Sequence, residues 1–246
     1  MIQSNTLLPV LFCILVCFGV PLSVSIAAAR KSRRYLVPFF VGALTFFVTQ
    51  ILLRIPIMQL WLAKQDWFLV LNQTNPLAYG LILGVSASVF EETGRYVSLR
   101  LLYRKGRRPD WCDGICFGAG HGGIEAILLV GINYLVALIL YGGAPGAPIR
   151  LILFAGLERL FTMASHIGMT MMVMQSVRKI TAYGLILALI THAAMDTGVV
   201  LMQLNGFSMG FIEFFIAVVG ILLLAYAWHT KRDFEDQSFI GHSQKF

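Results

Sequence analysis

The sequence predicts an all-α, polytopic transmembrane helix bundle, and this prediction rests on its composition and its long apolar runs. Of the 246 residues, 58% are hydrophobic and only 13% are charged, and the mean hydropathy is +0.77. Soluble globular domains carry about 25% charged residues. We expect a single membrane-embedded unit over residues 1–230, followed by a polar cytoplasmic tail at 231–246.

The spans are predicted from apolar runs close to the roughly 20 residues that a helix needs to cross the hydrocarbon core. Seven runs have this length, at about 7–29, 35–53, 77–103, 111–140, 150–177, 181–203 and 208–228. The first run follows no basic residue and is too long for the apolar part of a signal peptide. We therefore predict that it is an uncleaved span.

The segment 54–76 differs from these runs, because Lys64 and Asp66 interrupt its apolar residues. Trp61 and Trp67 suit a membrane–water interface. We interpret the segment as an interfacial or half-inserted helix. If it crossed the membrane, the number of spans would be eight.

Basic residues gather in alternate connections between the predicted spans, at 30–34, 104–108, 178–179 and 231–232. The remaining connections hold only Arg54, Lys64 and Arg150. By the positive-inside rule, the C-terminus is cytoplasmic and the N-terminus lies outside. An eighth span would scatter the basic clusters over both sides, which favours seven.

Two adjacent carboxylates, Glu91 and Glu92, lie inside the run predicted to span at 77–103. A charged residue near the bilayer centre costs about 2.5–3.5 kcal/mol even on lenient scales. Such residues face the bundle interior, and the first hypothesis for them is a functional site.

Three histidines lie at the depth of this glutamate pair. Counted inward from the predicted cytoplasmic edges at 1.5 Å per residue, Glu91, His121, His166 and His192 are all roughly 15–18 Å deep. A single intramembrane histidine often serves only packing. Four polar groups from four helices in one layer indicate a common site.

Helical spacing supplies Glu91 and Glu92 with a cationic neighbour. Arg95 follows Glu91 by four residues and Glu92 by three, so it can pair with either. The guanidinium favours ionisation of one carboxyl group, and repulsion between the two favours protonation of the other. This arrangement suits a general base.

The same spacing pairs a histidine with a carboxylate on two other helices. Glu125 follows His121 by four residues, and Asp196 follows His192 by four. Each carboxylate can orient the imidazole by fixing its tautomer.

Purely structural explanations exist for several neighbouring residues. Arg95 can serve as a counter-ion only, and Glu158 and Arg159 can form a structural ion pair nearer the outer surface. The glycines around His121 suit either close helix packing or space for a substrate backbone. They are Gly118, Gly120, Gly122 and Gly123.

The chain resembles the glutamic-type intramembrane proteases, a superfamily that includes the type II CAAX prenyl proteases, the bacterial CPBP proteins, PrsW and YhfC. The resemblance covers about 80–200 and rests on three ordered motifs, Glu91-Glu92-Thr93-Gly94-Arg95, Phe117-Gly118-Ala119-Gly120-His121 and His192-Ala193-Ala194-Met195-Asp196. Glu125 and His166 match further positions of the PrsW-like branches. Within this superfamily the chain is most similar to the YhfC family, because it has both His121 and Glu125 in a short bundle.

The resemblance implies an endopeptidase in which a glutamate and a histidine activate water, without a covalent intermediate. Carried over, Glu91 is the base, Glu92 is its partner and His121 is the second group that holds the water. His192 and Asp196 lie on the oxyanion side. The family pattern of the CAAX branch has Asn where this chain has Asp196, and an ionised carboxylate repels an oxyanion. We therefore expect Asp196 to orient His192.

The candidate catalytic residues are thus Glu91, Glu92, His121, His166, His192 and Asp196, supported by Arg95 and Glu125. No metal is required by this mechanism. A zinc-dependent variant is the alternative, with His121, His166 and His192 as ligands. The chain has no His-Glu-x-x-His motif, which disfavours it.

Two non-enzymatic functions compete with the protease. One is a non-catalytic membrane scaffold subunit, and the other is a proton-coupled transporter, because buried carboxylates and histidines also form proton relays. The expected surroundings are a lipid bilayer, that of a bacterial plasma membrane, and the expected partner is a peptide or membrane-protein substrate. No nucleic-acid partner is expected.

Overall fold

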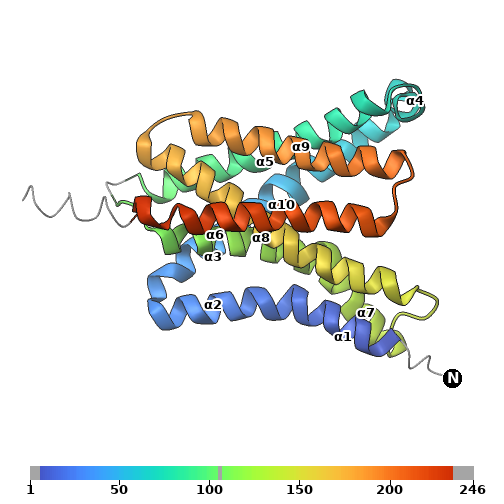
Figure 1. Ribbon diagram of the computed structural model, residues 1–246, viewed down its shortest axis with the longest axis horizontal. Coiled ribbons are helices and arrows are strands. Elements are labelled where there is room, and N and C mark those ends of the chain that lie inside the picture. Colours follow the sequence, from blue (N-terminus) through green and yellow to red (C-terminus); the bar gives the residue numbers. More distant parts are fainter. Residues whose placement is uncertain (1–5, 105–106, 235–246) are drawn as a thin grey trace, which may run out of the picture.

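Long apolar helices run side by side along the molecule in a computed structural model, which describes residues 6–104 and 107–234 (Figure 1). No strand occurs in these residues. Six helices are long and apolar enough to cross a membrane, and a seventh span is obtained if the bent pair Asp66–Thr74 and Pro76–Leu102 is counted as one. The prediction of an all-α bundle of about seven spans is confirmed.

The elements follow one another with short connections. They are α1 (Leu7–Ile14), η2 (Leu15–Gly19), α2 (Val20–Lys31), η3 (Arg33–Tyr35), α3 (Leu36–Phe46), η4 (Phe47–Arg54), η5 (Ile57–Trp61), η6 (Leu62–Lys64), α4 (Asp66–Thr74), α5 (Pro76–Leu102), α6 (Trp111–Ala126), η7 (Ile127–Gly131), α7 (Ile132–Tyr141), α8 (Ile149–Lys179), α9 (Tyr183–Leu204) and α10 (Met209–His229). Residues 231–234 are also helical, and the rest of the predicted tail, 235–246, lies outside the described residues.

Local sequence explains where the site-bearing helices α5 and α6 begin. Pro76 occupies the first turn of α5, where its missing N–H is no loss, and the Asn75 side chain accepts a hydrogen bond from the Ala78 N–H at 3.0 Å. Asp110 and Asp113 form a reciprocal capping box at the start of α6. The apolar residues that follow continue each helix without a further helix-start signal.

The segment 54–76 only partly follows the interfacial interpretation. Residues 54–64 extend the second span, which runs from Arg33 to Lys64. Pro56 does not end this helix, because it lies between wide π-helical turns, η4 and η5. Only α4 leaves the span direction, meeting α5 at a bend of 119°.

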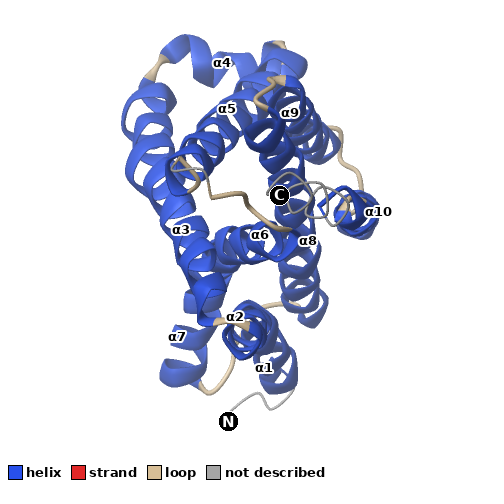
Figure 2. Ribbon diagram, turned by 90° about the vertical axis from the view of Figure 1, so that its left-hand side faces the viewer, coloured by secondary structure: helices blue, strands red, loops and turns tan. Residues whose placement is uncertain are grey.

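Helix α6 lies inside the bundle, between α3 and α8, with α2 on a further side (Figure 2). A Cβ on Gly118 would lie 2.6 Å from the Ile167 Cα, and one on Gly120 would overlap the Phe39 carbonyl oxygen. These glycines therefore permit close helix contact, the packing explanation, and leave no space for a substrate backbone. Helices α5 and α9 pack together, and α10 covers α8 from outside.

The described residues of all four predicted basic clusters lie at one end of the bundle, on the left in Figure 1. Arg34 pairs with Asp110, the Lys31 ammonium lies 2.8 Å from the Cys112 Sγ, and Lys231 lies over the Trp111 ring. We call this end, formed by 30–34, 104, 107–111, 178–180 and 231–232, the basic end. The connections 142–148 and 205–208 lie at the opposite end.

Candidate functional site

The predicted polar layer borders a cavity of about 300 Å³ between the helices. Lining side chains come from five segments, η4, α5, α6, α8 and α9, and α10 contributes Ile216. Among them are Glu91, Glu125, His166, His192 and Asp196. Four of the six candidate catalytic residues therefore face one space.

Glu91 is held from three directions. Its Oε2 lies 2.9 Å from the His121 Nε2 and 3.8 Å from the His166 Nδ1. Its Oε1 accepts a hydrogen bond from the Gln50 side-chain amide. Glu91 is 4% exposed and still lines the cavity, so its carboxylate can meet a water molecule or a substrate there.

Glu92 has the opposite surroundings and is fully buried. The Arg95 Nη1 donates to both of its oxygens at 2.6 Å, and Arg95 is itself fully buried. The Arg95 guanidinium is 4.0 Å from the Glu91 carboxylate. The cation therefore neutralises Glu92 in the core and leaves Glu91 to the cavity.

His166 has one defined tautomer, because a guanidinium can only donate. The Arg95 Nη2 donates to its Nδ1 at 3.0 Å, so the proton is on Nε2, which donates to the Glu125 Oε2 at 2.5 Å. Glu125 also accepts from Arg159 at 2.7 Å, and Arg159 pairs in turn with Glu158.

His192 lies between two carboxylates. Its Nδ1 is 2.8 Å from the Glu92 Oε1, and its Nε2 is 3.4 Å from the Asp196 Oδ2. The Asp196 side chain is 34% exposed, whereas His192 is buried. Both ring nitrogens can therefore donate protons when the ring is charged.

The structure brings all six candidate residues and both supporting residues into one connected network. Two of the candidates, Glu92 and His121, do not line the cavity. Glu125 contacts His166, whereas its spacing in the sequence had suggested a contact with His121. The His121 Nδ1 has no hydrogen-bond partner among the described residues. The predicted pairing of His192 with Asp196 is present.

Three further side chains belong to this network and were not singled out as site residues from the sequence. Gln50 donates to Glu91, Arg54 donates to Gln50 and to the Leu83 carbonyl, and Arg159 reaches Glu125. A polar amide in the middle of an apolar span is a signal for Gln50. Arg54 was assigned to a connection, because the length of the second span was underestimated.

Comparison with known proteins assigns the chain to a family. A family model described as YhfC intramembrane metalloprotease matches residues 12–146 and 145–222, most of the chain. The chain belongs to the YhfC family of intramembrane metalloproteases. A curated relative, the "uncharacterized membrane protein YhfC" of Bacillus subtilis (strain 168), is 29% identical over 247 residues, which cover 89% of this chain and 94% of the relative. No solved structure matches the chain.

The family description raises the question of whether these residues suit a metal ion. One ligand atom each from Glu91, His121 and His166 lies within 4.8 Å of the others, a set that excludes the His192 of the predicted trio. Histidine and carboxylate are ordinary zinc ligands. A histidine that binds zinc through one nitrogen commonly donates the N–H of the other to a carboxylate, and the His166 Nε2 contacts Glu125 in this way.

Charge also favours a cation at this cluster. The cavity and its network hold the carboxylates of Glu91, Glu92, Glu125, Glu158 and Asp196 against the guanidinium groups of Arg54, Arg95 and Arg159. The Arg95 contact at the His166 Nδ1 would have to give way for that nitrogen to become a ligand. With that one change, the donor set fits zinc.

Proposed function

We propose that this protein is an intramembrane endopeptidase that hydrolyses a peptide bond with a water molecule activated at Glu91. The observation that carries the proposal is the position of Glu91, at the cavity wall and among His121, His166 and Gln50, while its neighbour Glu92 is neutralised in the core. Helical spacing left open which glutamate pairs with Arg95, and the pairing of Arg95 with Glu92 favours Glu91 as the base.

The reaction consumes one water molecule and leaves no part of the substrate on the protein. Glu91 accepts a proton from the water while the water oxygen bonds to the substrate carbonyl carbon. The C–N bond then breaks, and Glu91 returns the proton to the leaving amine nitrogen. Gln50 holds the Oε1 atom, so the Oε2 atom, beside His121 and His166, is the one that exchanges the proton.

His192 is placed to stabilise the negative oxygen that develops on the substrate. Glu92 accepts from its Nδ1 and favours the protonated ring. The other nitrogen, Nε2, faces the cavity beside a partly exposed Asp196. A carbonyl oxygen there would replace Asp196, 3.4 Å away, as the acceptor of the Nε2–H and would receive a charge-assisted hydrogen bond, the interaction that usually contributes most to the acceleration of acyl transfer.

In the metal-dependent alternative, Glu91, His121 and His166 would hold zinc, and Glu91 would then be a ligand in place of the base. The metal would supply Lewis acidity and a water molecule that ionises near neutral pH. Purified, chelator-washed protein should then retain about one zinc per chain, and Glu91→Gln should lower that ratio. Metal content below that ratio in wild type would support a metal-free Glu91 base.

Proteolysis itself is tested by comparing new peptide N-termini in membranes that contain wild type, Glu91→Gln or Glu213→Gln. Glu213 is a matched control, since it is also a buried carboxyl group in an apolar helix and does not line the cavity. Termini present with wild type and Glu213→Gln, and lost with Glu91→Gln, would establish the activity and name a substrate.

The competing functions predict other results. A scaffold subunit would co-purify with a partner and would not depend on Glu91. A transporter would show Glu91-dependent proton flux in liposomes. Either of these results, with identical N-termini for all three proteins at equal levels, would contradict the protease.

A further inference from the structure

The site cavity extends to one side of the catalytic layer only. Helices α5 and α8 run towards the basic end, whereas α6 and α9 run away from it (Figure 1). Lining residues precede the site residue on α5 and α8 and follow it on α6 and α9. Examples are Leu83 on α5, Glu158 and Thr162 on α8, Glu125 on α6, and Val199 and Val200 on α9. Every one of these positions lies on the side away from the basic end.

The other side of the layer is filled with side chains. Leu99, Phe117, Met169, Met171 and Met174 are all fully buried there, in one continuous apolar cluster. Protein interiors packed in this way leave few voids larger than a water molecule. A second cavity, of about 460 Å³, lies at the basic end among arginines and shares no lining residue with the site.

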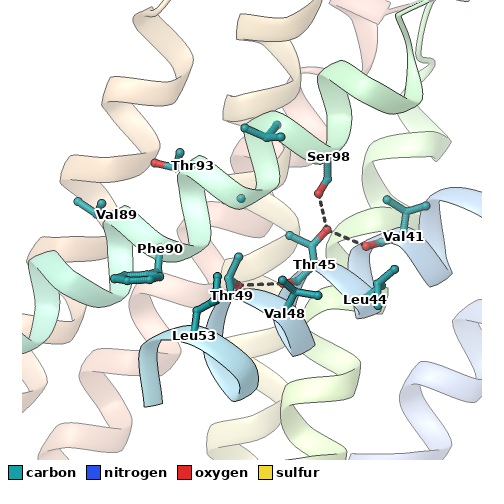
Figure 3. A pocket seen from close by; sticks show the side chains of 12 residues that line it. Val41, Leu44, Thr45, Val48, Thr49, Leu53, Val89, Phe90, Thr93 and Ser98 are labelled. Atoms are coloured by element: carbon teal, nitrogen blue, oxygen red, sulfur yellow. Dashed lines mark hydrogen bonds between the residues drawn. The ribbon is translucent and has the colours of Figure 1, made fainter. Parts of the chain in front are cut away.

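An apolar groove on the lipid-facing side of the bundle is a second route that needs consideration. It measures about 520 Å³ and lies between α3–η4 and α5 (Figure 3). Its lining includes Thr45, Thr49, Phe90 and Val97, and none of its residues lines the site cavity. The Thr45 and Thr49 hydroxyl groups donate hydrogen bonds to backbone carbonyls of their own helix. Their protons are therefore not offered to the groove, whose wall is mostly apolar.

The site cavity, in contrast, is polar towards its mouth. Arg54, Glu158, Arg159 and Asp196 line it between the catalytic layer and the end opposite the basic loops. Charged side chains at membrane depth face water-filled cavities or the bundle interior. Hydrolysis needs water at Glu91, and this polar wall gives water a path.

We propose that peptide substrates reach Glu91 from the end of the bundle opposite the basic loops. The positive-inside rule places the basic loops in the cytoplasm. The substrate is then an extended peptide segment on the extracytoplasmic side of the membrane. That a substrate uses this opening rests on the proposed protease function. The direction in which the cavity opens does not depend on that function.

The direction is testable by cysteine labelling with a charged, membrane-impermeant thiol reagent. The parent is Cys112→Ser, because the other cysteines, Cys13, Cys17 and Cys116, are buried. Thr162→Cys and Val199→Cys place a thiol in the cavity from two helices, so that one failed variant does not end the test. Ile180→Cys marks the basic end and Phe207→Cys the opposite end, both at exposed side chains.

We expect both cavity cysteines and Phe207→Cys to react equally in intact and permeabilised cells, and Ile180→Cys to react only after permeabilisation. Cavity cysteines that behave like Ile180→Cys would overturn the proposal. So would cavity cysteines that stay unlabelled while Phe207→Cys reacts, since access would then be lateral or closed. If Phe207→Cys were labelled only after permeabilisation, the end opposite the basic loops would be cytoplasmic, and the proposal of an extracytoplasmic substrate would be wrong. Labelling reports no proteolysis, so an outward opening without cleavage would count only against the protease function.

Discussion

The two halves of the bundle on either side of the Glu91 layer differ in packing and in charge. The half towards the basic end, which we call the closed half, is a dense apolar cluster of methionines and aromatic rings. The other half, the open half, holds the polar cavity. The glutamate pair lies at the boundary, with Glu92 facing the closed half's Arg95 and Glu91 facing the cavity.

This difference shows how one short motif serves two purposes. Adjacent residues on a helix point about 100° apart, so Glu91 and Glu92 cannot share one environment. The buried Glu92–Arg95 pair fixes the helix α5 side chains and neutralises a charge, while Glu91 keeps access to water. We therefore expect substitutions in the closed half to lower stability, and substitutions in the open half to lower activity.

Arg95→Met is expected to have the largest effect. It leaves Glu92 buried without its cation, and breaking a buried pair in this way costs about 3–5 kcal/mol. The thermal unfolding midpoint in detergent should fall strongly. Adding Glu92→Gln to Arg95→Met removes the unpaired charge and should recover part of the loss. A single variant as stable as wild type would show that the closed half does not depend on this pair.

Two methionines provide a matched comparison of the halves. Met171 is fully buried inside the apolar cluster of the closed half, whereas Met195 lies at the edge of that cluster and lines the cavity. Met171→Ala should cost about 2–5 kcal/mol, because it creates a hole in dense packing. Met195→Ala only widens a cavity that already exists and should cost less. Equal losses in unfolding free energy would mean that the open half is packed as tightly as the closed one.

The sequence was sufficient for the fold and for placing the predicted site residues together in one layer. Apolar length predicted the spans, and the depth count placed Glu91, His121, His166 and His192 in one layer, where the structure has them. Both inferences depend on helix rise alone, which varies little in a membrane.

The arrangement within the site depended on tertiary packing, which helical spacing does not encode. Spacing along α6 suggested Glu125 for His121, but the rotation of α6 against α8 turns Glu125 to His166. Spacing along α5 allowed Arg95 to pair with either glutamate. Arg54 was not included in the site, because the second span was predicted to end at about 53 and π-helical turns continue the helix to Trp61. Gln50 lies inside the predicted span, and its contact with Glu91 depends on how that span packs against α5.

Filling the mouth of the open half should lower activity with little change in stability. Val200→Trp places a large ring among the cavity residues, and we expect proteolysis to fall by tenfold or more, about 1.4 kcal/mol in barrier terms. Val97→Trp is the control, because it places the same ring in the lateral groove that Figure 3 shows. If Val97→Trp were the variant that blocks cleavage of the identified substrate, access would be lateral and the comparison of halves would need revision.

Asp196→Asn is expected to have the smallest effect, and it tests the role of the open half most finely. The Asp196 carboxylate is 3.4 Å from the His192 Nε2 and 34% exposed, and such partly solvated pairs contribute about 0–1 kcal/mol. Stability should therefore stay within that range. If Asp196 only orients His192, the amide oxygen can still accept its proton, and cleavage should fall by less than about tenfold. An activity loss as large as that of Glu91→Gln would instead assign Asp196 a direct part in proton transfer, because the amide keeps the geometry and removes only the titratable group.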